Sequence, residues 1–139
     1  MSIIIHAQEI YDCSYTSYDY EENDRSKLTP RKLELEEIIS KKEKLKVIID
    51  SENIKVTKYD KETREMGTEQ NYKIQTIENN VIVGLYKPLY FGSDQVDLFI
   101  VEKNANGGGY AALKEYYKKK TLDGDINVII SHYYTCEKI

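Results

Sequence analysis

The sequence predicts an α+β fold: a mostly antiparallel sheet of about six or seven strands with two packed helices, in the order β-α-β-β-β-β-β-α-β. Two observations lead to this prediction. Short runs of alternating apolar and polar residues recur along the chain, separated by turn-forming residues, as in antiparallel hairpins. Two other segments have the spacing and charge order of helices that pack on a sheet. The length of 139 residues is typical of one domain, and we expect residues 1–139 to form a single domain.

The first expected element is a long strand over Ser2–Tyr15. Its odd-numbered positions are mostly apolar, and Glu9 is the exception, so one face of the strand should be buried. The alternation weakens beyond Thr16. We expect Glu21–Asp24 to form a solvated loop.

A helix is expected over residues 30–43. Thr29 can cap the free N–H groups at its start, and Pro30 suits the first helical position, where its missing N–H costs nothing. Glutamates lie early in this segment and lysines lie late, which complements the helix dipole.

The middle of the chain has the pattern of successive hairpins. Lys46–Asp50 pairs with Ile54–Tyr59, and Tyr72–Ile77 pairs with Val81–Tyr86 across a turn of residues that tolerate a left-handed backbone. Val96–Lys103 is a further strand with apolar residues on both faces, which indicates a central position.

A glycine-rich loop follows, then a segment expected to be a short helix over Tyr110–Lys120 and a last strand over Ile126–Tyr134. Consecutive glycines before a helix free several backbone N–H groups to point at one spot, which suits a phosphate or carboxylate. The alternative is that the loop only turns the chain. The residues of this possible anion or cofactor site are Asn106, Gly107, Gly108, Gly109 and Tyr110.

This segment resembles the cofactor loop of the GNAT acetyltransferases, in which a strand leads through a glycine-containing loop into a helix. The resemblance implies a small acyltransferase in which Gly107, Gly109 and the backbone of Tyr110 contact the phosphates of acetyl-CoA. It also implies that Tyr133 or Tyr134 acts as a general acid. Asn106 stands where that family has Gln or Arg, and little chain remains for its final strands.

Charge and cysteine content restrict the function classes. The formal net charge is −4, so a basic footprint for nucleic acid is absent over the chain as a whole. Two cysteines make no disulfide framework, and neither a signal peptide nor an apolar run of membrane-spanning length is found. We therefore expect a cytoplasmic protein with no membrane partner.

No reactive constellation stands out, and we expect neither catalytic residues nor a metal site. His6 and His132 lack a second ligand at the spacing of a metal motif. Asp94, Asp97 and Glu102 do not match the spacing of a metal-dependent nuclease. A cofactor is expected only for the acyltransferase alternative.

The stretch YDCSYTSYDYEEND at residues 11–24 is dense in tyrosines and carboxylates and has no Lys or Arg. Tyrosine gives a large contact area at low entropic cost, and carboxylates complement a basic groove. We therefore expect a non-enzymatic binding or inhibitor protein that docks on a partner with a basic surface, and a phage or other mobile element as its origin. A structural homodimer is a further alternative. The expected partner-binding residues are Tyr15, Tyr18, Asp19, Tyr20, Glu21, Glu22 and Asp24.

Overall fold

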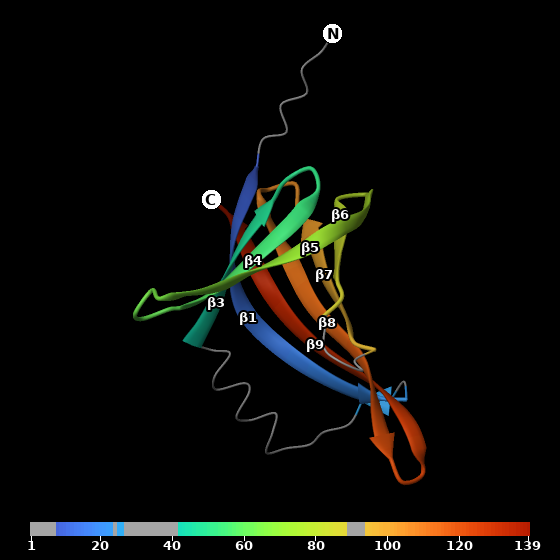
Figure 1. The fold of residues 1–139 in the computed structure, drawn as a ribbon. Coiled ribbons are helices and arrows are strands. Elements are labelled where there is room, and N and C mark those ends of the chain that lie inside the picture. Colours follow the sequence, from blue (N-terminus) through green and yellow to red (C-terminus); the bar gives the residue numbers. More distant parts are fainter. Residues whose placement is uncertain (1–7, 24, 27–41, 89–93) are drawn as a thin grey trace.

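The chain forms an all-β antiparallel barrel in the computed structural model, which describes residues 8–23, 25–26, 42–88 and 94–139 (Figure 1). The α+β prediction is wrong: strands are the elements of the described residues, and they form one sheet of nine strands. The strands are β1 (Glu9–Glu22), β2 (Arg25–Ser26), β3 (Glu43–Ile49), β4 (Asn53–Asp60), β5 (Met66–Glu78), β6 (Val81–Tyr86), β7 (Val96–Lys103), β8 (Gly108–Thr121) and β9 (Gly124–Lys138).

The barrel has the simplest up-and-down topology. From β3 to β9 each strand pairs antiparallel with the next one in the chain, and β1 pairs with both β3 and β9. Because β2 pairs only with the end of β1, the other eight strands close the ring. A closed ring has no unpaired sheet edge.

The prediction of a second helix is wrong, because residues 110–120 lie in strand β8. These residues are good helix formers by propensity, but strands β7 and β9 pair with them along their length. Ala111 and Leu113 point into the barrel, and Tyr110 and Lys114 alternate with them on the outside. The first expected helix, over residues 30–43, falls almost wholly outside the described residues, and Glu43 begins β3.

The hairpins of the middle of the chain are confirmed. β3 pairs with β4 and β5 with β6, as the alternation predicted. The turn between β5 and β6 has Asn79 at φ 51° and Asn80 at φ 66°, the left-handed backbone that asparagine tolerates. The strand over Val96–Lys103 is confirmed, with its bounds, as β7.

The core is the inside of the barrel. Leu45, Val47, Ile54, Phe99 and Val101 come from three strands and are at most 2% exposed. The Tyr72 ring packs against the Phe99 ring, with 5.4 Å between the two ring centroids. An eight-stranded barrel is just wide enough for side chains to fill it or to leave room for one small ligand.

A disulfide joins the first and last strands of the ring. Cys13 of β1 and Cys136 of β9 lie opposite each other in the ladder, and both sulfurs are inside the barrel. The cysteine count alone did not predict this bond, because the two residues are 123 positions apart in the sequence.

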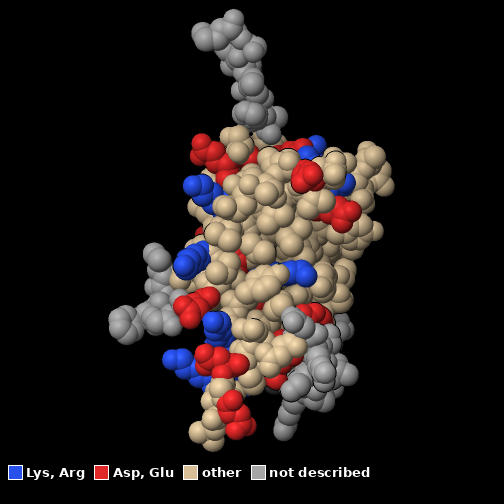
Figure 2. Space-filling model, turned by 90° about the vertical axis from the view of Figure 1, so that its right-hand side faces the viewer, with Lys and Arg blue, Asp and Glu red and all other residues tan. Residues whose placement is uncertain are grey.

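The outer wall differs from strand to strand. The outward positions of β6 and β7 carry Val83, Leu85, Leu98 and Ile100, which are half-buried. In the view of Figure 2, uncharged residues cover most of the middle of the wall, and Lys, Arg, Asp and Glu gather toward its rims. Within the part of the chain that is described, no helix has the length and apolarity to span a membrane.

Candidate ligand-binding site

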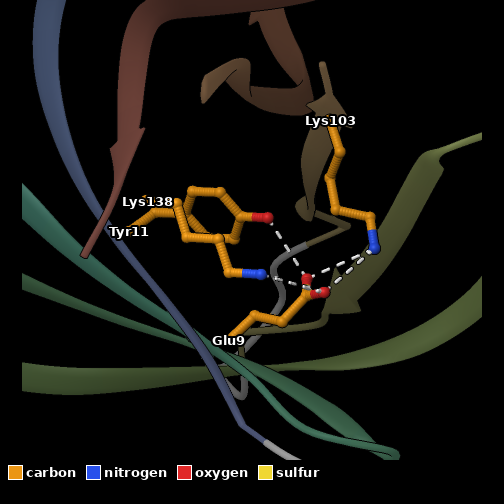
Figure 3. A network of polar contacts seen from close by, with 4 residues as sticks. All are labelled: Glu9, Tyr11, Lys103 and Lys138. Carbon is orange, nitrogen blue, oxygen red and sulfur yellow. Dashed lines mark hydrogen bonds and ion pairs between the residues drawn. The ribbon is translucent and has the colours of Figure 1, made fainter. Parts of the chain in front are cut away.

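The two ends of the barrel carry different chemistry. At the end where the chain leaves β9, Glu9 points inward and accepts hydrogen bonds from Lys103 and Tyr11 (Figure 3). Lys103 Nζ lies 3.3 Å from both carboxylate oxygens, and Lys138 Nζ lies 3.9 Å from Oε1. Burial, followed by the Glu9 charge and hydrogen bond, raises the pKa of the Tyr11 hydroxyl to about 12. We call these four residues and the disulfide the closed end.

The opposite end, which we call the mouth, contains a cavity of about 270 Å³. Its apolar floor is formed by Leu45, Val56, Tyr72 and Leu113. Five polar side chains from four strands surround the opening, so the cavity has an apolar body and a polar rim. These rim residues are Lys58, Thr68, Gln70, Asp97 and Glu115.

Two carboxylates stand directly opposite each other in the cavity wall. Asp97 of β7 and Glu115 of β8 are cross-strand partners, and both side chains face the inside. Like charges in this position destabilise a sheet. Burial is the main cause that raises the pKa of Asp97, and the Glu115 charge adds to it. A hydrogen bond of 2.9 Å from Gln95 Nε2 to Asp97 Oδ1 opposes the rise.

His132 lies in a smaller chamber of about 30 Å³ beside the main cavity, with Glu43 and Tyr134 in its wall. Its Nε2 lies 3.6 Å from Glu115 Oε1. Its Nδ1 is buried and has no hydrogen-bond partner among the described residues. The ring of Tyr18 meets the imidazole edge-on, with 4.9 Å between the ring centroids.

The negative charges at the mouth also raise the pKa of two tyrosine hydroxyls. Burial raises the pKa of Tyr72, and the charges of Asp97 and Glu115 raise it further. Burial likewise raises the pKa of Tyr134, with Glu43 as the next cause. The phenol rings and the carboxylates therefore form one electronegative wall.

The expected partner-binding residues lie on two faces of β1. A bulge between Tyr15 and Ser17 keeps both Tyr15 and Tyr18 on the inner face. Tyr20 and Glu22 follow them on that face, where the Tyr20 hydroxyl donates a hydrogen bond of 2.9 Å to Glu22 Oε1. Burial and this contact raise the pKa of Tyr20 to about 12.

Asp19 and Glu21 alternate to the outer face of β1, opposite Ser131 and Ile129 of β9. Asp24 lies outside the described residues. Four of the seven expected residues are therefore on the inner side of the barrel wall and two are on the outer side. Contact with a partner protein through them stays a prediction.

The glycine-rich loop is the hairpin turn between β7 and β8. Gly107 adopts φ 89°, and its N–H donates to the Asn104 carbonyl, while the Gly108 N–H donates to the Asn106 side chain. A Cβ on Gly109 would lie 2.4 Å from the Glu102 carbonyl oxygen. The glycines thus serve a tight turn and a close strand approach. An acetyl-CoA site requires a helix directly after this loop. That prediction is wrong, because strand β8 follows the loop and Tyr110 is an exposed residue of that strand.

Sequence reasoning missed the carboxylate pair. Asp97 did give a signal, because it shares the buried face of its strand with Phe99 and Val101. A charged residue on such a face costs free energy unless something compensates it. Glu115 gave none, because the sequence predicts a helix over residues 110–120.

Within the described residues, no group of three or more His, Cys, Asp or Glu side chains is arranged to hold a metal ion. No protein-family model matches the chain, and no curated protein matches it significantly.

Proposed function

We propose that this protein is a non-enzymatic binding protein that holds one small organic ligand in the mouth of the barrel. The observation that carries the proposal is the cavity of about 270 Å³ with an apolar floor and convergent polar side chains at its rim. Small-molecule sites are concave, mostly apolar and supplied with a few polar groups that fix orientation. The volume is just below the range of sites for drug-sized ligands, which favours a smaller molecule.

The sequence also favours a binding protein. It predicts the binding site on residues 15–24, whereas the site proposed here is the cavity at the mouth. Docking of a basic partner on β1 and pairing of two copies stay predictions. The disulfide supports an oxidising compartment in place of the cytoplasm, since cytoplasmic thiols are kept reduced.

The test is a thermal-shift screen with small aromatic and alicyclic compounds, repeated on a variant whose cavity is filled. Leu113→Trp places a large ring in the cavity, because Leu113 lines both chambers. We expect compounds that stabilise the wild type to lose their effect on this variant. Leu98→Trp adds the same ring on the outer wall and should leave binding unchanged.

A second variant protects the test against misfolding of Leu113→Trp. Thr68 is an exposed rim residue, so Thr68→Trp narrows the opening with little effect on the core. Equal stabilisation of the wild type and of both cavity variants would place the ligands elsewhere and refute the proposal.

A further inference from the structure

We infer that the ligand is an organic cation: a protonated amine on a compact apolar body, with its nitrogen between the Asp97 and Glu115 carboxylates. This inference rests on the proposed function and assigns the chemical class of the ligand.

The carboxylate pair has too little positive charge beside it. Among the described residues, the polar contact of Asp97 is a neutral amide, and that of Glu115 is the His132 imidazole at 3.6 Å. At the closed end, by contrast, one carboxylate has two lysine ammonium groups within 4 Å. A cation between Asp97 and Glu115 would turn their mutual repulsion into two attractions.

Lys58 does not supply that cation. It lines the cavity from β4, which lies across the ring from β8. Its side chain is exposed, and no ion pair joins it to either carboxylate in the part of the chain described. Lys58 therefore lies on the opposite side of the rim. The space beside Asp97 and Glu115 stays open to a ligand.

The aromatic lining favours the same class of ligand. Tyr72 forms part of the cavity floor, and Tyr134 lines the adjoining chamber. Phenol rings attract an ammonium group over their faces, and this attraction grows when the cation is desolvated. A carboxylate ligand would meet Glu43, Asp97 and Glu115 and be repelled, and an uncharged ligand would leave the pair uncompensated.

The experiment compares head groups on a constant body. Calorimetric titrations at neutral pH use phenyl, indolyl and cyclohexyl compounds, each with an ethylamine, an ethanol or a propanoate chain. The protein is the intact chain with its disulfide, treated with EDTA. In each series we expect the amine to bind about tenfold or more tightly than the alcohol, and the carboxylate to bind most weakly.

The variants Asp97→Asn and Glu115→Gln remove one charge each and nearly preserve side-chain shape. Each should reduce the amine-over-alcohol preference by about five- to tenfold. Glu102→Gln is the matched control, because Glu102 is an exposed outward residue of β7, the same strand as Asp97. It should leave the preference as in the wild type.

The outcomes separate the two proposals. If alcohols and amines bind the wild type equally, or if the preference survives in both variants, the cation inference is wrong and the binding function stands. If no compound of any series binds at millimolar concentration, both proposals fail. A preference for the propanoate would overturn the inference outright.

Discussion

The closed end and the mouth place carboxylates inside the same barrel, but they compensate them differently. At the closed end, Glu9 has two lysines, a tyrosine hydroxyl and a covalent bond between strands nearby. At the mouth, Asp97 and Glu115 face each other across the ladder above a cavity. The first arrangement holds the structure together. In the second, two carboxylates lie together without a compensating positive charge among the described residues, and such an arrangement is typical of a functional site.

The largest effect is expected from removing the disulfide of the closed end. The double variant Cys13→Ala with Cys136→Ala should lower the free energy of unfolding by about 3–5 kcal/mol, because the bond closes a very long loop in the unfolded chain. Guanidinium unfolding measures this loss. A reducing agent should destabilise the wild type and leave the variant unchanged; two titratable thiols in the folded wild type would contradict the bond.

The next effect is expected at Gly109, which pairs with Lys103 and Cys136 of the closed end. Gly109→Ala should cost about 2–3 kcal/mol, because its Cβ would lie 2.4 Å from a backbone oxygen that cannot move away easily. Gly108→Ala is the control, since the nearest atom to its Cβ would be 3.2 Å away. If both variants are equally stable by thermal unfolding, the strand approach does not require a glycine.

Neutralising Glu9 should have a smaller effect. Glu9→Gln leaves Lys103 and Lys138 without their shared carboxylate, and we expect a loss of about 1–2 kcal/mol in urea unfolding. Glu102→Gln removes an exposed acid of the neighbouring wall and should change stability by no more than about 0.5 kcal/mol. Equal effects of the two variants would show that the closed end gains nothing from its ion pairs.

The mouth should respond in the opposite direction. Asp97→Asn removes one of two like charges, and it should raise the free energy of unfolding at neutral pH by up to about 1 kcal/mol. Because the folded protein raises the Asp97 pKa, the gain should be full above the folded pKa and should vanish as the pH falls below the ordinary value of 3.8. The measurement is urea unfolding across this range, with the exposed Asp123→Asn as control. A loss of stability at neutral pH would show that the carboxylate is compensated.

The comparison also explains how much of the structure could be predicted. The hairpins of residues 46–59 and 72–86 followed from local alternation and turn residues, so the sequence was sufficient for them. Closure of the ring depends on β1 and β9, which are more than a hundred residues apart in sequence, and local patterns carry no information about that pairing. Residues 110–120 have helical propensity, which pairing on both sides overrode.

The candidate site could be predicted only in part. Asp97 shares a face of its strand with the buried Phe99 and Val101 and could have been noticed from its strand alone. Its meaning depends on Glu115, which becomes its neighbour only when residues 108–121 form a strand. The sequence predicts Tyr18 and Tyr20 as part of a contact surface for a partner, and the bulge between Tyr15 and Ser17 brings both to the inner face instead.

The cross-link between Cys13 and Cys136 has one more consequence. Together with the backbone between these residues, it makes a covalent loop that contains every hairpin tip from β3 to β9. A protease that nicks one tip therefore cannot release a fragment. The nicked molecule should run as one band on a denaturing gel without reductant and as two bands with it.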